Sequence, residues 1–587
     1  MKLFKIFPFF LFFLSLLNPF QIIAQSKPNV VLVITDDQGY GDLASHGNPY
    51  LPTGSIDRFK EESTSFNRFY VSPVCAPTRA SLLSGKWAIG TGVWGVTHRN
   101  EVMPSEVYTL AEMFKDHGYK TGAFGKWHNG AQYPENPLGQ GFETFLGFTA
   151  GHHNNYFNTT LINEHQEKIE TEGYITDVVT DRAVEFIQNC SNSKPFFCYV
   201  PINTPHSPFQ IADTYFKKYK SMGLSDKDAA VYGMCENIDE NFAKLLRAID
   251  KKGIKDNTIV IFMTDNGPNG ERYNANMKGI KASNDEGGVR VPFFIRYPGK
   301  IKPNQVIEKI AAHIDVMPTL ASYCGIKIDT NAIDGVDLQP LINNPKADIP
   351  DRYIFSHWSG LTWSPSGGSV RNNEYRLVVR ENDTNLYNMV KDPFQKNDIK
   401  DSEQEISKQL HSIYNDWVTE QWKMGNKTVP IKIGYKEAPT TLIEAHELNI
   451  NSGLSFHGKY GWANDWIENW DEKKDTVSLS LTVKNEGTFN FEIEYQTEDS
   501  KIGSTLTLTT QDKRLEANIN EPFVGTIVKG PDRVARKEVD EQSWGRMQLG
   551  ELYLKEGTTE IKLFAEDIKN KKVLDLKSLI ITFKEEN

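Results

Sequence analysis

The chain has 587 residues, and its 76 acidic against 65 basic residues give it a net charge of −11. This length exceeds one ordinary hydrophobic core, so we expect two or three domains. The acidic balance argues against a nucleic acid or an anionic membrane surface as the main partner. Basic side chains gathered in one pocket would therefore point to a particular site and would not follow from the overall charge.

Residues 1–24 are predicted to be a secretory signal. Lys2 and Lys5 precede an almost unbroken apolar run from Ile6 to Leu17, and a polar segment begins at Gln25. The run is short for a membrane span, so we expect cleavage rather than the alternative, a membrane anchor. The mature protein is then expected to be exported, either periplasmic or secreted.

Two apolar, β-branched runs, 29–35 and 258–264, predict central strands buried on both faces of a parallel sheet. Each run ends in oxygen-bearing side chains, at the edge of a sheet where α/β proteins bind ligands. These side chains suit a hard divalent cation, although a solvated loop is the alternative for the pair that follows the first run. The four are Asp36, Asp37, Asp265 and Asn266.

The stretch from Cys75 to Gly85 has an unusual spacing of cysteine, proline and arginine. Pro77 fits the first turn of a helix, which places Cys75 at the positive end of the helix dipole. Arg79, one turn further on, returns to the same face. An isolated cysteine here would more simply be a buried residue before a helix.

A predicted helix over 107–117 stops at Gly118 and leads into Gly118–His128. Lys126 and His128 are two residues apart, so they point to the same side of an extended segment. Helices are also predicted over 174–188 and 226–250, on either side of a buried strand at 196–200. That strand leads to His206, whose backbone is restrained between Pro205 and Pro208, although a solvent-exposed turn histidine is the alternative.

Four segments resemble motifs of the type I sulfatases, the arylsulfatase-like members of the alkaline phosphatase superfamily. Cys75–Gly85 matches every fixed position of C-x-P-[ST]-R-x-x-L-L-x-G, and Gly118–His128 matches every fixed position of G-Y-x-T-x-x-x-G-K-W-H. Pro205–Pro208 resembles P-H-x-P. Lys281–Pro292 resembles K-G-x-x-x-E-G-G-x-R-x-P, with Ala282 where glycine is usual. The resemblance covers roughly residues 27–430 and suggests a bacterial polysaccharide sulfatase.

The resemblance implies an alkaline-phosphatase-like α/β fold and hydrolysis of a sulfate ester. It implies that Cys75 is oxidised to Cα-formylglycine (3-oxoalanine) by a formylglycine-generating or anaerobic sulfatase-maturing enzyme. The hydrated aldehyde would attack sulfur in line, and its second hydroxyl would later expel sulfate. Ca²⁺, or alternatively Mg²⁺, would be held by Asp36, Asp37, Cys75, Asp265 and Asn266.

The resemblance also implies roles for the remaining motif residues. Arg79, Lys126 and Lys281 would offset charge on the sulfuryl oxygens. Lys278 competes with Lys281 for its position. His206 would protonate the leaving alcohol and His128 would take the proton of the second hydroxyl. Two further motif residues, Glu286 and Arg290, are expected to be structural.

We expect a signal peptide (1–24), a catalytic α/β domain (25–325), a smaller antiparallel sulfatase C-terminal subdomain (326–435) and an accessory β-sandwich (436–587). The last assignment rests on period-2 strands separated by turns, and this part loosely resembles galactose-binding-like modules. Three tryptophans could stack on sugar rings, but their four-residue spacing favours packing. They are Trp462, Trp466 and Trp470.

The expected substrate is a sulfated polysaccharide or its oligosaccharides, such as algal ulvan or carrageenan. Candidate sugar contacts in loops are His98, Arg99, His152, His153 and Asn154. One alternative is a phosphodiesterase or phosphonate monoester hydrolase of the same superfamily, and another is a glycan-binding protein with an inactive catalytic domain. Apart from Cys75 the chain has four cysteines, of which Cys190 and Cys198 could pair, but we expect buried thiols.

Overall fold

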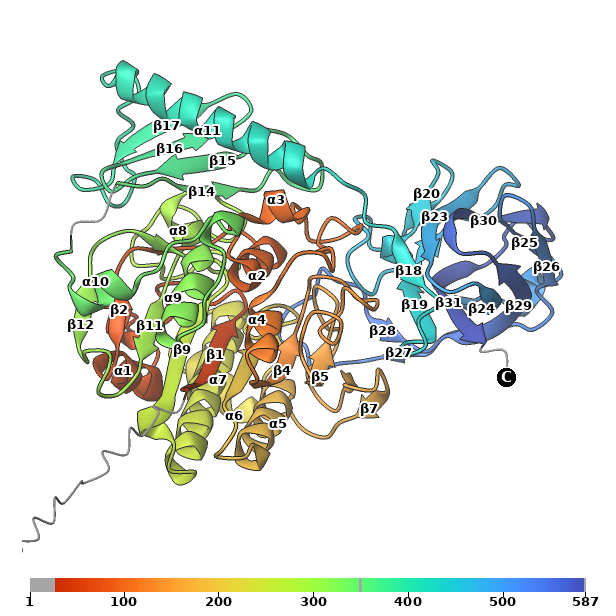
Figure 1. Cartoon of the computed structure of the whole chain (residues 1–587). Coiled ribbons are helices and arrows are strands. Elements are labelled where there is room, and N and C mark those ends of the chain that lie inside the picture. The colour runs from red at the N-terminus through yellow and green to blue at the C-terminus, as the bar shows by residue number, and fades with distance from the viewer. Residues whose placement is uncertain (1–26, 348–350, 585–587) are drawn as a thin grey trace, which may run out of the picture.

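The computed structural model describes residues 27–347 and 351–584, so the predicted signal segment lies outside the described residues. Its centre is a ten-stranded mixed sheet (Figure 1). In sheet order the strands are β12 (Gln305–Ile307), β2 (Thr64–Phe66), β11 (Phe293–Arg296), β9 (Thr258–Thr264), β1 (Asn29–Thr35), β8 (Phe196–Pro201), β4 (Lys120–Lys126), β5 (Thr144–Phe148), β6 (Thr160–Asn163) and β7 (Lys168–Glu170).

The four strands β9, β1, β8 and β4 are adjacent and parallel, so their carboxyl ends meet at one edge of the sheet. Every residue of β1 and β9 is buried, as the continuous apolar runs predicted. Alternate side chains enter two separate cores, with Leu32 on one face and Val33 on the other. Such strands need helices on both faces and leave only their ends for function.

Helices cover both faces of this sheet (Figure 1). One core includes side chains of α2 (Cys75–Ser84), α4 (Leu110–Asp116), α9 (Val316–Tyr323) and α10 (Gln339–Asn343). The other includes side chains of α1 (Gly54–Glu61), α5 (Ile175–Asn189), α6 (Asp213–Lys220) and α7 (Asp226–Lys251). Two short helices, α3 (Ala88–Thr91) and α8 (Glu286–Val289), lie in the connections.

The helix predicted from residue 107 begins three residues later, at Leu110. Thr109 accepts a hydrogen bond from the Glu112 backbone N–H, and Glu112 accepts one in return from the Thr109 backbone. This capping box fixes the start of the helix, and Val107 and Tyr108 remain outside it. The apolar residue pattern alone therefore placed the helix start too early.

Two smaller sheets follow the large one. A four-stranded antiparallel sheet comprises β14 (Ile354–His357), β15 (Gly368–Arg371), β16 (Tyr375–Val379) and β17 (Thr384–Asn388). Its apolar side chains pack against α11 (Gln404–Gly425). A three-stranded sheet is made of β10 (Arg290–Val291), β3 (Phe69–Tyr70) and β13 (Ala311–Ala312), and its Tyr70 and Ala312 side chains belong to one core with Trp87 and Ile354.

The C-terminal part, drawn in blue tones in Figure 1, contains two six-stranded sheets and a two-stranded one. The first sheet holds β18 (Ile431–Ile433), β20 (Asn449–Ile450), β23 (Thr476–Val483), β25 (Thr505–Thr509), β26 (Arg514–Asn518) and β30 (Gly557–Asp567). The second holds β19 (Thr440–Glu444), β21 (Ser455–Phe456), β22 (Ile467–Glu468), β24 (Gly487–Gln496), β29 (Gly545–Leu554) and β31 (Asp575–Lys584). β27 (Ile527–Val528) pairs with β28 (Glu541–Gln542).

The two six-stranded sheets share one hydrophobic core, so they form a sandwich. Strand β24 alternates buried and half-buried side chains along its whole length, the period-2 pattern predicted from the sequence. The predicted fold class, a large mixed sheet with helices, a small antiparallel sheet and an appended β-sandwich, is confirmed.

All five cysteines are buried free thiols, which confirms the prediction that Cys190 and Cys198 do not pair. In the described part of the chain, no helix combines the length and the apolar character that a membrane crossing requires.

Candidate active site

Oxygen-bearing side chains from two strand ends meet at the carboxyl edge of the large sheet. Asp36 and Asp37 follow β1, Asp265 and Asn266 follow β9, and Thr35 is paired in register with Thr264. The Asp37 backbone N–H donates to Asp265 Oδ1 over 3.1 Å, and Asn266 Nδ2 donates to Asp37 Oδ1 over 2.8 Å. Residues more than two hundred positions apart are therefore brought into one buried cluster.

Cys75 lies at the first position of α2 and faces this cluster. One ligand atom each from Asp36, Cys75 and Asp265 lie within 4.8 Å of one another. The cysteine is only 3 % exposed, and burial raises the pKa of its thiol despite the positive charges of nearby lysines. An unmodified Cys75 is therefore a neutral thiol and a poor nucleophile.

Three cations surround the carboxylates. Arg79 donates to Asp265 Oδ2 over 2.9 Å and to the Lys126 carbonyl over 2.9 Å. Lys126 Nζ lies 2.6 Å from Asp36 Oδ2, and Lys281 Nζ lies 2.9 Å from Asp37 Oδ2. The alternative lysine, Lys278, donates instead to the Tyr387 hydroxyl over 2.7 Å. The geometry thus places Lys281, and not Lys278, in the cluster.

The carboxylate cluster fits a divalent cation. Asp36 Oδ1 and Asn266 Oδ1 are buried and have no hydrogen-bond partner. Burial, and after it the negative charge of Asp36, raises the pKa of Asp265 to about 7. Three carboxylates face three side-chain cations, so their formal charges balance, and the cluster keeps free oxygen atoms of the type that Ca²⁺ and Mg²⁺ prefer.

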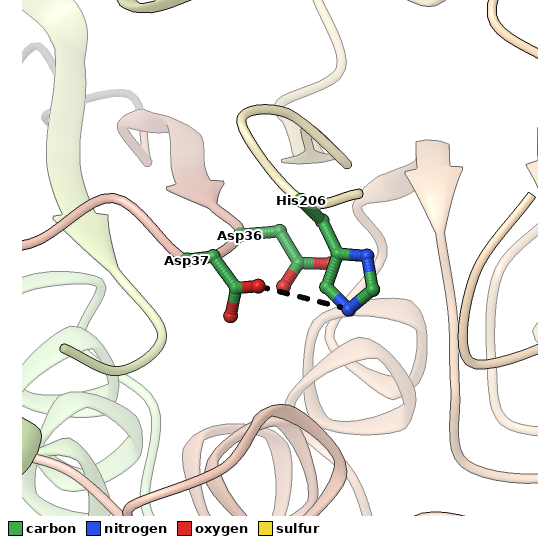
Figure 2. Close-up of side chains that lie close together, drawn as sticks. All are labelled: Asp36, Asp37 and His206. Carbon is green, nitrogen blue, oxygen red and sulfur yellow. Dashed lines mark ion pairs between the residues drawn. The ribbon is translucent and has the colours of Figure 1, made fainter. Parts of the chain in front are cut away.

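His206 reaches the cluster from the loop after β8, and Figure 2 shows its ring facing Asp37. His206 Nε2 lies 3.7 Å from Asp37 Oδ2. Its Nδ1 is 2.7 Å from the Ser207 carbonyl, so Nδ1 carries a hydrogen and Nε2 faces the cluster. Burial lowers the pKa of His206, and the charge of Lys281 lowers it further.

His128 follows β4 and is 2 % exposed. Its Nε2 is 3.0 Å from the Val96 carbonyl, which assigns a hydrogen to Nε2 and leaves the buried Nδ1 without a partner. Burial lowers the pKa of His128 well below its usual value. The imidazole is thus neutral, and Nδ1 has a free lone pair with which to accept a proton.

The backbone is left-handed at three positions of the site, with φ angles of 63° at Asp37, 68° at His128 and 69° at Ala282. Residues with a side chain seldom adopt this region, and strain of this kind gathers at functional sites. It also explains why glycine is usual at position 282 in the family motif, since glycine enters this region without cost.

Glu286 and Arg290 lie away from the cluster. Glu286 is buried, accepts a hydrogen bond from the Tyr70 hydroxyl over 2.8 Å and pairs with Arg376 over 2.9 Å. Arg290 pairs with Glu286 over 3.5 Å. Glu286, on α8, thus links Tyr70 and Arg290 of the three-stranded sheet to Arg376 of the four-stranded sheet, in agreement with the expected structural role.

Two residues of the site escaped the sequence prediction. Asn269 Nδ2 donates to Asp37 Oδ2 over 3.0 Å, and Arg272 donates to the Asp37 carbonyl over 2.9 Å. Both lie within seven residues of Asp265, in the turn after β9. Polar residues directly after a predicted strand-end acid were the available signal.

The candidate sugar contacts divide into two groups. His98 contacts the His446 and Tyr460 carbonyls at 3.1 and 2.9 Å, and Arg99 pairs with Glu447 at 2.9 Å, so both hold the C-terminal domain. His153 contacts the Thr160 carbonyl at 3.0 Å.

His152 lies close to the site, and Asn154 follows two residues further along the same segment. The His152 ring lies parallel to that of His206, with centroids 6.4 Å apart. Two of the three tryptophans pack inside the C-terminal domain: Trp470 is fully buried in its core, and Trp466 stacks on His457 with centroids 4.1 Å apart. Packing therefore accounts for them, as their spacing indicated.

The fold and this cluster define a hydrolase whose buried carboxylates, cations and helix-terminal cysteine meet at the edge of a mixed sheet. Comparison with known families is consistent with this. Residues 28–326, just over half of the chain, match the Sulfatase family, and residues 282–419 match the family described as N-sulphoglucosamine sulphohydrolase, C-terminal. The chain belongs to the sulfatase family and is a sulfuric ester hydrolase.

Three relatives illustrate the range of similarity. The uncharacterized sulfatase YdeN of Escherichia coli (strain K12) is 26% identical over 68% of this chain and 87% of its own length. An ulvan-active sulfatase of Formosa agariphila is 29% identical over 64% of this chain and 77% of its own length. The mouse N-acetylgalactosamine-6-sulfatase is 31% identical over 57% of this chain and 69% of its own length.

Among solved structures, Ps i-CgsB in complex with k-i-k-neocarrahexaose is similar with a TM-score of 0.63 and 26% identity. The similarity covers 68% of this chain and 98% of that chain. The sulfatase yidJ of Bacteroides fragilis shares the fold, with a TM-score of 0.59 over 67% of this chain and 96% of its own.

Proposed function

We propose that this chain hydrolyses a sulfate ester of a sulfated carbohydrate, with Cys75 serving as the precursor of a formylglycine nucleophile. The observation that carries the proposal is the position of Cys75 at the N-terminus of α2, within 4.8 Å of the buried carboxylates of Asp36 and Asp265. Oxidised by a maturation enzyme and hydrated, residue 75 offers one hydroxyl to attack sulfur and another to expel sulfate.

Asp36, Asp37, Asp265 and Asn266 would hold the cation, which we propose to be Ca²⁺. When bound, that cation supplies positive charge for a sulfate oxygen and lowers the pKa of the hydroxyl it touches. Arg79, Lys126 and Lys281 stabilise the negative charge on the remaining sulfate oxygens. The three basic side chains are held in place because each already pairs with a carboxylate of the site.

The two histidines have complementary proton roles in this proposal. His206 faces the cluster through Nε2, which lies 3.7 Å from Asp37 Oδ2; it would take up a proton on Nε2 before the reaction and then donate that proton to the leaving sugar oxygen. His128 is neutral, with a buried and unpartnered Nδ1, and accepts a proton when sulfate departs. Acid and base therefore come from the segments that follow two different strands, β8 and β4.

A sulfated carbohydrate is the substrate class that the relatives favour. Their names include an ulvan-active sulfatase and N-acetylgalactosamine-6-sulfatases, and the complex of Ps i-CgsB contains a neocarrahexaose. An exported enzyme with a C-terminal β-sandwich is suited to soluble or cell-surface polysaccharides. We therefore propose sulfated algal oligosaccharides, of ulvan or carrageenan type, as the first substrates to test.

The test is release of inorganic sulfate from a panel of defined sulfated oligosaccharides, with nitrophenyl phosphate as the control for a phosphatase-type activity. The wild-type protein, produced together with a maturation enzyme, is expected to release sulfate from at least one saccharide, whereas Cys75→Ala releases none. Phosphate release without sulfate release, or equal activity of the two proteins on the saccharide, would overturn the proposal.

A further inference from the structure

One loop of the C-terminal domain leaves its sheets and lies on the catalytic domain. The paired strands β27 and β28 lie between the C-terminal sheets and the catalytic domain (Figure 1). They are joined by residues 529–540, here named the 529–540 loop. This loop contacts the segment after β8 and the segment after β5, the two segments that carry His206 and His152.

The first half of the loop is fixed to the segment after β8. Asp532 forms a β-bridge with Gln210 and accepts a hydrogen bond from Gln210 Nε2 over 2.7 Å. The Arg533 backbone N–H donates to the Phe209 carbonyl over 3.1 Å, and its guanidinium pairs with Asp213 over 2.7 Å. Backbone and side-chain bonds together define one position for this half.

The second half is fixed to the segment after β5. Arg536 is 7 % exposed at its side chain, pairs with Asp532 over 2.7 Å and donates to the Asn154 carbonyl over 3.0 Å. Asn155 Nδ2 donates to Glu541 Oε2, at the end of the loop, over 2.5 Å. The loop is thereby held on both sides of Glu538.

Glu538 is the loop residue that meets the catalytic machinery. One of its carboxylate oxygens accepts a hydrogen bond from the Ser207 hydroxyl, and Ser207 adjoins the general acid His206. The other oxygen accepts the Lys537 backbone N–H over 3.2 Å. A carboxylate has about four acceptor sites, so Glu538 keeps the capacity to accept from a ligand.

A second observation points to a ligand beside Glu538. His152 is 6 % exposed, its Nε2 has no hydrogen-bond partner, and its ring lies parallel to that of His206. Asn154 is equally buried, and its side-chain oxygen also lacks a partner. Buried polar atoms without partners are costly, so the free Nε2 of His152, beside the His206 ring, indicates a polar binding partner.

We propose that the C-terminal domain builds the leaving-group side of the active site, and that Glu538 selects the sugar bound there. This inference rests on the proposed function, in which His206 protonates the leaving sugar oxygen. The ring carbons next to that oxygen then lie toward Ser207, Glu538 and His152. A carboxylate accepts a hydrogen bond from a free sugar hydroxyl and repels a second sulfate at the same position.

The substrate class that follows is a saccharide with a free hydroxyl beside the sulfate ester that is hydrolysed. The matched test substrates are two oligosaccharides that share this ester and differ at the neighbouring carbon, which bears a hydroxyl in one and a second sulfate in the other. The variants are Glu538→Gln, which removes the charge, and Glu538→Asp, which keeps it. The control is Asp540→Asn, whose side chain is 49 % exposed on the same loop and which loses a 3.4 Å pair with Arg536 while Arg536 keeps its 2.7 Å pair with Asp532.

The wild-type enzyme should prefer the monosulfated oligosaccharide in kcat/KM. Glu538→Gln should lower kcat/KM for the monosulfated oligosaccharide by roughly 10- to 100-fold, the usual effect of losing a charged hydrogen bond. The variant should also show a smaller preference for the monosulfated over the disulfated oligosaccharide. Glu538→Asp should keep the preference, because repulsion of a second sulfate acts through space, and Asp540→Asn should match the wild type. Melting temperatures of all variants check that they fold.

The outcomes separate the two proposals. Wild-type protein that releases sulfate from no saccharide refutes the proposed function, and the role of Glu538 with it. Wild-type activity with an unchanged substrate preference in Glu538→Gln refutes the role of Glu538 alone. Equal losses in Glu538→Gln and Asp540→Asn would show that the loop matters only for folding, and would also overturn the inference.

Discussion

The large sheet and the C-terminal sandwich use their strands in opposite ways. Strand β1 is buried at every residue, whereas strand β24 alternates buried and half-buried side chains. Helices cover both faces of the large sheet, so only the ends of its strands remain for chemistry. In the sandwich, each sheet buries one face in a shared core, and the loops between strands are free to reach the neighbouring domain.

This difference separates the parts of the active site. Strand ends and the first turn of α2 supply the groups that we propose to bind the sulfate, because adjacent parallel strands hold their ends in fixed register. Loops of the sandwich contact the catalytic domain through Arg99, Ser207 and Gln210. We infer that the groups at the edge of the large sheet determine the reaction, and that the loops of the sandwich determine which sugar is accepted.

The largest expected effect is at the cluster of strand ends. Lys281→Ala should lower kcat by about 100- to 1,000-fold, the usual loss when one fixed donor to a developing charge is removed. Its matched control is Lys278→Ala, three residues away, whose amine binds the Tyr387 hydroxyl instead. Rates of sulfate release would decide, and a larger loss for Lys278→Ala would show that the two lysines had been assigned in the wrong order.

The next effect concerns the interface of the two regions. Arg99→Ala should reduce the free energy of unfolding by about 3 kcal/mol, because it leaves Glu447 buried without its partner. The control is Lys408→Ala, which breaks an exposed pair with Glu405 and should cost less than about 0.5 kcal/mol. Urea denaturation measures both, and equal losses would contradict a tight interface.

The pH dependence of stability should report the same interface. Burial raises the pKa of Glu101 from 4.5 to about 7, and the negative charge of nearby Glu447 adds to the effect. Because the folded state holds this proton more tightly than the unfolded state, its contribution is complete below pH 4.5 and is lost as the pH rises to about 7.

The loss amounts to about 3 kcal/mol at 1.36 kcal/mol per pKa unit. Glu101→Gln cannot ionise and should remove that pH dependence, so its stability relative to the wild type should be higher at pH 8 than at pH 4.5. Urea midpoints at the two pH values measure the difference. A wild-type protein and variant with parallel pH profiles would show that Glu101 ionises normally.

The smallest effect is at a strained residue of the site. Ala282 has a φ of 69°, so Ala282→Gly should relieve strain and stabilise the fold by about 1 kcal/mol. Thermal denaturation would measure the gain. A destabilised variant would indicate that the greater chain entropy of glycine in the unfolded state outweighs the strain.

Much of the catalytic cluster could be predicted from the sequence because its residues stand at recognisable strand and helix ends. Asp36 and Asp265 follow long apolar runs, and Cys75 precedes a helix with proline in its first turn. Parallel pairing of β1 with β9 then brings the two acids together. For these residues, local sequence patterns were sufficient together with the rule that parallel strands end at the same edge of a sheet.

Glu538 could not be predicted in the same way. It lies 331 residues from Ser207, between two strands of two residues each that have no apolar period. No local pattern indicates which face a loop of a β-sandwich will contact, because that depends on how two domains pack. Arg99 and His98 show the same limit: they were candidate sugar contacts and instead hold the C-terminal domain.

The central claim, that Cys75 is the precursor of the nucleophile, is tested most directly by mass spectrometry of the tryptic peptide from Phe69 to Arg79. In protein that hydrolyses a sulfated saccharide, this peptide should be lighter by about 18 Da than the sequence requires, as conversion of the thiol to an aldehyde demands. An unmodified Cys75 peptide in fully active enzyme would contradict the account.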